Sequence, residues 1–203
     1  MSTALLIFAK APVAGLAKTR LIPALGAEGA AFFAEKLLDH AVTQALAAEV
    51  DHVELCVTPD TSHAAFQRHL KQANGRLVLT TQGDGDLGLR MDRALTRNLQ
   101  HHGKVLLTGS DAPGLGPEML REAAASLGHH DVVFVPAIDG GYALVGLKKP
   151  APLLFSNMTW STPQVMSDSR ERARRAGLRW IELSPVADMD EPADFVHLPH
   201  DWI

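Results

Sequence analysis

The sequence has little cysteine and no long hydrophobic run. Cys56 is the single cysteine among 203 residues, so no internal disulfide can form, and its apolar neighbours at 53–57 predict an inert thiol in a buried strand. No segment approaches the roughly 20 apolar residues of a membrane-spanning helix. The first apolar stretch, 4–9, is short and follows no positive residue, unlike a signal peptide. We therefore expect a cytoplasmic protein without membrane association.

An excess of positive charge is also missing. The chain carries 19 Lys and Arg against 23 Asp and Glu, a net charge of −4, whereas nucleic-acid-binding domains are usually basic. We therefore expect no nucleic-acid partner, although a local cationic pocket remains compatible with this charge. The length and the 46% hydrophobic content suit one globular domain over 1–203, and no linker, repeat or low-complexity tract divides it.

Apolar runs alternate with helical patterns along the chain. The runs predict strands at 4–9, 52–57, 76–81, 104–108, 131–136, 142–147 and 179–183, and the helical patterns predict helices at 28–49, 61–72, 87–101, 117–127 and 164–176. Such alternation with continuously apolar strands predicts an α/β fold, with a mostly parallel sheet covered on both faces.

A cationic loop follows the first predicted strand. It contains Lys10, Gly15, Lys18, Thr19 and Arg20. Glycine lets a backbone approach a ligand and cations neutralise phosphate, so the loop predicts a phosphorylated ligand, a nucleotide or nucleotide sugar. It matches neither the phosphate loop of nucleoside triphosphatases nor the dinucleotide motif G-x-G-x-x-G. The alternative is a solvated turn with scattered lysines.

One acid follows the strand predicted at 104–108. Asp111 would lie at the carboxyl end of the sheet, where open α/β proteins bind ligands. A carboxylate there suits Mg²⁺ or Mn²⁺ held jointly with ligand phosphates. The alternative is that Asp111 only orders the turn at Pro113 and Gly114.

A third motif joins two predicted strands. Asp139 could orient or deprotonate an acceptor hydroxyl. Gly140 and Gly141 allow a ligand to approach closely, and with Tyr142 they are our candidates for binding the acceptor or sugar. The alternative is a hairpin turn of the Asp-Gly kind.

Two further segments carry candidate residues. In Asp188-Met189-Asp190-Glu191-Pro192-Ala193-Asp194, a carboxylate could supply a second metal ligand, and the alternative is a solvated acidic loop in which Asp194 or its neighbours start a short helix. Arg90 lies near the start of the helix predicted at 87–101, from which it could contribute to the nucleotide site.

These motifs together resemble a known family. The resemblance rests on Phe8-Ala9-Lys10-Ala11-Pro12 with Lys18-Thr19-Arg20-Leu21, Gly85-Asp86-Leu87-Gly88, Gly109-Ser110-Asp111, Asp139-Gly140-Gly141-Tyr142, Trp160-Ser161-Thr162-Pro163 and Asp188-Met189-Asp190. They occur in the same order, over nearly the whole chain, in the bacterial DUF2064 family of GT-A-like proteins, some of which are labelled glycosyltransferases of arsenosugar biosynthesis. The resemblance implies a nucleotide-diphospho-sugar transferase fold: a three-layer α/β/α sandwich with a mixed, mainly parallel sheet.

The resemblance also implies roles for individual residues. The nucleotide would bind the first loop, through Lys10, Gly15, Lys18, Thr19 and Arg20. The metal would bind Asp111, and the late D-x-D-x-P segment would bring Asp190 near it. The chain departs from the D-x-D motif of many glycosyltransferases, since Ser110-Asp111-Ala112 keeps one acid of the pair.

Three functions follow as hypotheses. The first is transfer of a glycosyl group from a nucleotide sugar to a small-molecule acceptor, aided by Mg²⁺ or Mn²⁺. The second is nucleotidyl transfer from a nucleoside triphosphate to a phosphorylated small molecule. The third is a nucleotide-binding module without turnover. The alanine-rich helix at 28–49 would pack internally or across a homodimer.

Overall fold

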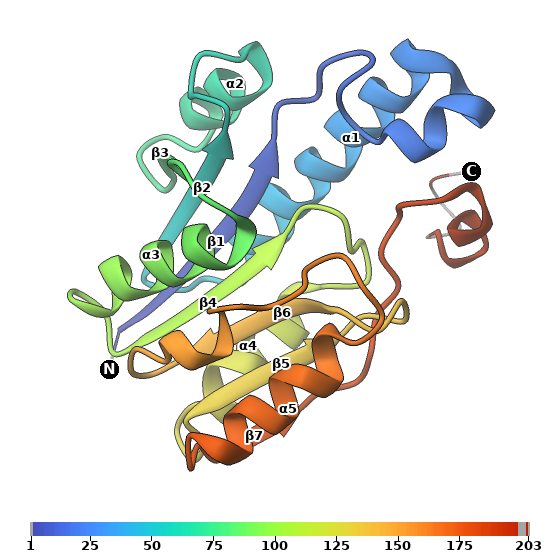
Figure 1. Cartoon of the computed structure of the whole chain (residues 1–203). Helices are drawn as coiled ribbons and strands as arrows, with labels where there is room; N and C mark the ends of the chain where they lie inside the picture. Colours follow the sequence, from blue (N-terminus) through green and yellow to red (C-terminus); the bar gives the residue numbers. More distant parts are fainter. Residues whose placement is uncertain (1, 199–201, 203) are drawn as a thin grey trace.

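The computed structural model describes residues 2–198 and 202 (Figure 1). It contains all the predicted strands and helices. The strands are β1 (Thr3–Lys10), β2 (His52–Thr58), β3 (Val78–Thr81), β4 (Lys104–Gly109), β5 (Val132–Pro136), β6 (Tyr142–Leu147) and β7 (Trp180–Glu182). The helices are α1 (Ile22–Ala47), α2 (Ala64–Gln72), α3 (Leu87–Leu99), α4 (Pro117–Ser126) and α5 (Val165–Arg175).

The strands form one mixed sheet in the order β3-β2-β1-β4-β6-β5-β7. Strand β6 pairs antiparallel with both β4 and β5, and the other pairs are parallel. The prediction of a mainly parallel sheet is therefore confirmed. Because β1, β4 and β5 all end at the edge where β6 begins, the loops that follow them gather at this edge. Ligands of open α/β sheets bind at such an edge.

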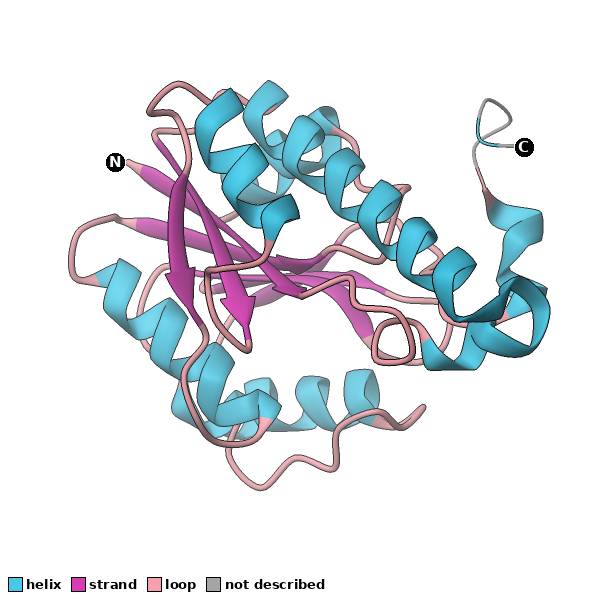
Figure 2. Cartoon of the chain, turned by 90° about the horizontal axis from the view of Figure 1, so that it is seen from above, coloured by secondary structure: helices cyan, strands magenta, loops and turns pink. Residues whose placement is uncertain are grey.

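Helices cover both faces of the sheet, which confirms the three-layer sandwich (Figure 2). Strand β1 shows the alternation clearly, because successive side chains of a strand point to opposite faces. Leu5 and Ile7 belong to the core beneath α1, α2 and α4, whereas Leu6 and Phe8 belong to the core beneath α3 and α5. Both sets are nine-tenths or more buried, so β1 is fixed from both sides.

Some local boundaries differ from the prediction. The helix predicted at 28–49 begins at Ile22 and is interrupted at Gly26, whose φ of 72° is not helical. Two short 3₁₀ helices were not predicted, η1 (Thr19–Leu21) and η2 (Pro152–Leu154), whereas η3 (Pro192–His197) matches the short helix expected near Asp194 if the acidic segment is a loop. Elements this short have no hydrophobic period that a sequence could display.

Across the described residues, no helix combines the length and apolar character needed to cross a membrane.

Polar contacts of Asp131 join the outer strands at the end of the sheet opposite the carboxyl ends of β1, β4 and β5. The backbone amide of Arg179 donates to Asp131 Oδ2 at 3.0 Å, and Lys148 Nζ lies 3.2 Å from Oδ1. The Arg179 amide, helped by the charge of Lys148, lowers the pKa of Asp131 to about 2. The carboxylate thus joins the start of β5 to the segments that follow β6 and precede β7.

We predict that Asp131→Asn lowers the free energy of unfolding at pH 7 by about 1–2 kcal/mol, since one pKa unit corresponds to about 1.4 kcal/mol. The depressed pKa stabilises the fold above the ordinary Asp value of about 4, and this contribution disappears as the pH falls toward 2. Urea unfolding at pH 7, 5 and 3 should therefore show the gap between wild type and variant closing at low pH. Equal stability at pH 7 would contradict the role of these contacts.

Candidate functional site

The loop after β1 turns back on itself at the edge of the sheet where β1, β4 and β5 end. Lys10 is the last residue of β1, and its ammonium donates to the Leu16 carbonyl at 2.8 Å. Gly15 has a φ of 78°, a conformation that glycine adopts without steric cost. Both Leu16 and Ala17 donate backbone hydrogen bonds to the Val13 carbonyl. The turn thereby directs the next residue, Lys18, back toward the sheet.

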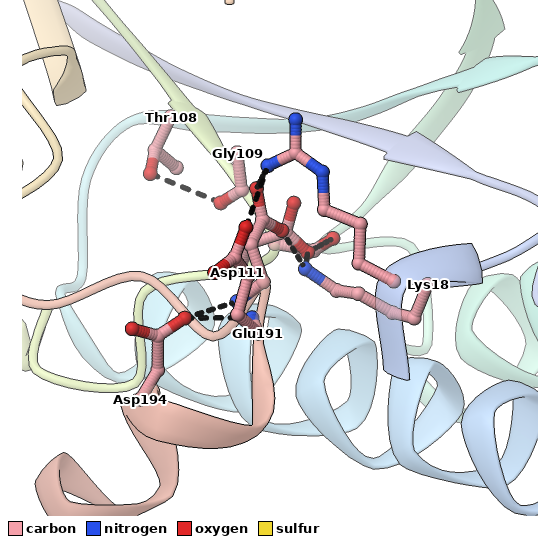
Figure 3. A network of polar contacts seen from close by, with 9 residues as sticks. Lys18, Thr108, Gly109, Asp111, Glu191 and Asp194 are labelled. Atoms are coloured by element: carbon pink, nitrogen blue, oxygen red, sulfur yellow. Dashed lines mark hydrogen bonds and ion pairs between the residues drawn. The ribbon is translucent and has the colours of Figure 1, made fainter. Parts of the chain in front are cut away.

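Lys18 lies between two carboxylates (Figure 3). Its Nζ is 2.9 Å from Asp111 Oδ1 and 2.7 Å from Asp190 Oδ1, and only 7% of its side chain is exposed. Burial by itself lowers the pKa of Lys18, but the charges of Asp111 and Asp190 outweigh it and the pKa is raised from its usual value. Lys18 is therefore a charged ammonium at neutral pH.

Asp111 reaches this position from the loop after β4. Its backbone carbonyl accepts a hydrogen bond from the Met189 amide at 2.9 Å. Met189 is fully buried, so this contact fastens the C-terminal segment to the β4 loop. Ser110 Oγ donates to Asp111 Oδ1 at 3.3 Å. The residue next to Met189 is Asp190, which explains why the two carboxylates meet.

Asp194 holds the turn that presents Asp190. Its Oδ2 accepts from the backbone amides of Asp190 at 3.0 Å and Glu191 at 2.7 Å (Figure 3). Arg20 approaches the same turn, with its Nη1 3.7 Å from Glu191 Oε1 and 4.0 Å from Asp190 Oδ2. The Arg20 side chain is 61% exposed, so its guanidinium remains accessible to a ligand.

Two cavities meet at this edge. The first, of about 490 Å³, is lined by Lys10, Lys18, Thr19, Arg20, Ser110, Asp111 and Asp190, together with Phe8, Leu16, Ala17, Ala34 and Ser161. The second, of about 340 Å³, shares Phe8, Lys10, Asp111 and Ser161 with the first and continues toward Asp139 and Tyr142. A ligand that spans both cavities would therefore pass Lys10 and Asp111.

The second cavity has an aromatic wall. Tyr142 and Trp160 pack edge to face with ring centroids 6.4 Å apart, and Phe8, Leu87 and Met91 add apolar surface. Burial raises the pKa of the Tyr142 hydroxyl. The buried Trp160 Nε1 has no hydrogen-bond partner within the described part of the chain. This cavity suits a less polar group than the cation-lined cavity does.

Asp139 lies in the turn between β5 and β6. Its Oδ1 accepts from the Gly141 amide at 2.8 Å, so the predicted Asp-Gly turn is present. Gly140 has a φ of 93°, and a Cβ there would lie 2.3 Å from the Pro163 carbonyl oxygen, so only glycine fits. The carboxylate of Asp139 nevertheless lines the second cavity. Asp139 can therefore both order the turn and contribute to an acceptor site.

The structure gathers most of the candidate residues. Lys10, Lys18, Thr19, Arg20, Asp111 and Asp190 line the first cavity, and Asp139, Gly141 and Tyr142 line the second. Gly15, Gly140 and Arg90 line neither, although the two glycines shape the turns beside them. Arg90 instead donates from Nε to the Gly85 carbonyl at 2.7 Å, which fastens the loop before α3. A nucleotide contact by Arg90 stays a prediction.

Two residues at the site were not among the sequence candidates. Asp188 lines a cavity of about 230 Å³ with Arg20, Asp139 and Asp190, and burial, then the charge of Asp139, raises its pKa to about 6. The sequence pattern that could have identified Asp188 is Asp188-Met189-Asp190, in which two acids flank a buried methionine. Ser161 lines both main cavities with a φ of 60°, and its signal was the motif Trp160-Ser161-Thr162-Pro163.

The donor set suits a divalent cation only with help from a ligand. Within residues 2–198 and 202, no three His, Cys, Asp or Glu side chains form a complete metal-binding group. Asp111 and Asp190 offer two carboxylates that converge on one point. Mg²⁺ in enzymes is commonly bound by one or two carboxylates, waters and substrate phosphates, so this pair fits such an ion.

Comparison with solved structures supports the fold. A crystal structure from Desulfovibrio desulfuricans G20, provisionally described as a nucleotide-diphospho-sugar transferase, matches with 30% identity and a TM-score of 0.85, over 96% of this chain and 85% of that one. CMP:2-keto-3-deoxy-manno-octonic acid synthetase in complex with CTP matches with 12% identity, a TM-score of 0.59 and coverage of 97% and 96%. The 4-diphosphocytidyl-2C-methyl-D-erythritol synthase of Anaerococcus prevotii DSM 20548 matches with 11% identity, a TM-score of 0.64 and coverage of 96% and 93%.

No curated protein matches the sequence. A family model described as "Uncharacterized protein conserved in bacteria (DUF2064)" matches residues 41–162, which is more than half of the chain. The chain belongs to the DUF2064 family.

Proposed function

We propose that this protein transfers a glycosyl group from a nucleotide sugar to a small acceptor, with the help of a divalent metal ion. The observation that carries the proposal is the junction of a cation-lined cavity and an aromatic cavity at Lys10 and Asp111. A donor diphosphate in one cavity and an acceptor in the other would place the scissile bond between them. The 30% identical relative, itself described as a nucleotide-diphospho-sugar transferase, supports this choice.

The cationic loop would bind the donor diphosphate. Lys10, Lys18 and Arg20 all line the first cavity, and Arg20 keeps an exposed guanidinium there. Cations concentrated in a cleft attract and neutralise phosphate, even in a chain whose net charge is negative. Thr19 could add a hydroxyl donor from the same loop.

Asp111 and Asp190 would hold Mg²⁺ or Mn²⁺ beside the diphosphate. A bound divalent ion supplies Lewis acidity, which stabilises negative charge on a departing nucleotide. The protein's own part is to present both carboxylates at one point, through the Met189–Asp111 backbone contact and the Asp194 turn.

Asp139 would act on the acceptor. Its carboxylate lines the second cavity, where it can orient an acceptor hydroxyl and take up its proton. Gly141 and Tyr142 form the adjacent wall. The hydrogen bond from the Gly141 amide occupies one carboxylate oxygen and leaves the other for the acceptor.

Nucleotidyl transfer is the second candidate. The motif Ser110-Asp111-Ala112 has one acid where many glycosyltransferases have two, and the first cavity, with its three cations, could accept a triphosphate. The reaction would attach the nucleotidyl group to a phosphorylated acceptor and release pyrophosphate. A binding module without turnover is the third possibility, and the same assays decide it.

A ligand panel tests the donor class. We expect one nucleoside diphosphate and its sugar to raise the melting temperature more with Mg²⁺ or Mn²⁺ than without, because a ligand that binds only the folded state stabilises it. Incubation of that sugar with acceptors should then release the nucleoside diphosphate. Pyrophosphate release from a triphosphate would favour nucleotidyl transfer, and binding without any product would favour the non-catalytic module. A panel without any stabilising nucleotide would overturn all three.

We predict that Asp111→Asn lowers kcat by about 10²–10³-fold, because it weakens charge stabilisation worth several kcal/mol at a metal-assisted transition state. The fold should persist, since Asn keeps the shape of the side chain. Glu118→Gln is the matched control, because its side chain is 82% exposed on α4 and lines none of the cavities described above. Circular dichroism and melting temperatures check folding, and full activity of the Asp111 variant would remove that residue from the mechanism.

We expect Asp139→Asn to separate the turn from the chemistry. Asparagine can still accept the Gly141 amide hydrogen bond, so the turn should remain while the proton acceptor is lost. A loss in kcat of about 10²–10⁴-fold, typical for a general base, with the donor KM unchanged is the expected result. An unchanged kcat would assign Asp139 to the turn alone.

A further inference from the structure

Among the cations of the first loop, Lys18 is placed unlike its neighbours. Its ammonium touches the Oδ1 atoms of both Asp111 and Asp190 and is almost completely buried. Lys10 donates to a backbone carbonyl, and Arg20 is largely exposed beside the same acidic turn. A lysine held between two carboxylates is an internal counter-ion for that pair.

The carboxylates that hold this ammonium are the two that we assign to the metal, and the ammonium occupies one oxygen of each. Lys18 Nζ lies 2.9 and 2.7 Å from them, whereas Mg²⁺ binds oxygen at about 2.0–2.1 Å. A metal ion that bridged these oxygens would therefore overlap the ammonium. One cation must leave before the other can bind.

We propose that Lys18 and the divalent cation occupy the same site between Asp111 and Asp190 in turn. The ammonium neutralises the two carboxylates in the ligand-free protein, and it moves onto the ligand phosphates when the metal binds. The phosphate partner in this inference rests on the proposed function. The exchange of cations between the two carboxylates does not depend on which transfer reaction follows.

The cavity beside Lys18 offers a second position for its ammonium. Lys18 lines the cavity of about 490 Å³ that it shares with Lys10 and Arg20, so a phosphate there would lie beside the same side chain.

The backbone of Lys18 has φ 46° and ψ 47°, a left-handed conformation that is unfavourable for a residue with a side chain. Such a conformation persists when surrounding contacts hold it, and the two ion pairs of the side chain are among those contacts.

Exchange has a thermodynamic consequence. A metal that binds alone must displace the ammonium and leave it without its carboxylate partners, which opposes binding. A phosphate in the cavity would supply a new partner for the ammonium and would therefore favour the metal. Metal and nucleotide should each strengthen the binding of the other by the same factor, because binding linkage is reciprocal.

The direct test measures Mn²⁺ affinity without any nucleotide. Free Mn²⁺ is followed by electron paramagnetic resonance in the wild type, Lys18→Gln and the matched control Lys10→Gln, which removes a cation of the same loop that does not contact these carboxylates. We expect Lys18→Gln to bind Mn²⁺ at least about tenfold more tightly, and Lys10→Gln to stay within about twofold of wild type, since Lys18, unlike Lys10, contacts both carboxylates. The double variant Lys18→Gln/Asp111→Asn should lose the gain. Unchanged or weaker binding by Lys18→Gln overturns the exchange.

The second test measures coupling. UDP, GDP, ADP and CDP are titrated in turn by calorimetry, with and without Mn²⁺. In the wild type, Mn²⁺ should tighten binding of the recognised diphosphate by about 5–150-fold, the usual range for coupled sites. Lys18→Gln should lower that factor and leave the part that comes from direct contact between metal and phosphate. Equal coupling in both proteins contradicts the exchange. If no diphosphate binds, the proposed function fails, while the metal titration still decides the exchange.

Folding of the variants is followed by melting temperature. Without Lys18 two carboxylates face each other unpaired, so Lys18→Gln should melt below wild type and recover more than wild type does on adding Mn²⁺. Lys18→Met keeps the apolar stem of the side chain and is the second uncharged variant, on which the same titration is read if Lys18→Gln does not fold. A Mn²⁺-induced rise no larger than that of wild type in the folded variant also counts against the exchange.

Discussion

The ammonium of Lys18 joins three segments that are far apart in the sequence. It binds Asp111 after β4 and Asp190 near the C-terminus, from a loop that follows β1. The backbone contact between Met189 and Asp111 and the capping of the turn by Asp194 keep both carboxylates in place. Removal of either carboxylate leaves the buried ammonium of Lys18 with a single partner, which opposes its burial.

Sheet topology explains why these loops can meet. Strands β1, β4 and β5 end at one edge, and the antiparallel strand β6 starts there, so the Asp139 turn faces the loops that carry Lys18 and Asp111. The hairpin β5–β6 therefore supplies the wall of the second cavity, through Gly141 and Tyr142. A wholly parallel sheet would need a crossover connection at this position and could not place a tight turn beside the site.

The sequence predicted the inner strands well because they are largely apolar and buried on both faces, as Leu5 to Phe8 illustrate, whereas the edge strands β3 and β7 are half-buried or exposed. It also indicated Lys18, Asp111, Asp139 and Asp190 separately, each from a strand end or an acidic motif. It could not show that Lys18 pairs with Asp190, because 172 positions separate them and no local pattern encodes that contact. The helix predicted from residue 28 starts just after the break at Gly26, and only the helical turn from Ile22 that precedes this break was not predicted.

The loop after β4 lacks the second acid of the D-x-D motif, and in the structure Asp190 of the C-terminal segment lies beside Asp111 instead. Many glycosyltransferases place two acids on one loop, two positions apart, whereas here the residues two positions from Asp111 are Gly109 and Pro113, and the second carboxylate comes from the C-terminal segment. Phe195 of that segment packs edge to face on Phe33 of α1, with ring centroids 5.5 Å apart, so the segment contacts α1 as well as the β4 loop. Solved structures at 11–12% identity share the sheet, but such identity establishes the fold alone. We therefore expect the chemistry of this family member to depend on the place where the C-terminal segment meets the β1 and β4 loops, and not on the sheet it shares with its neighbours.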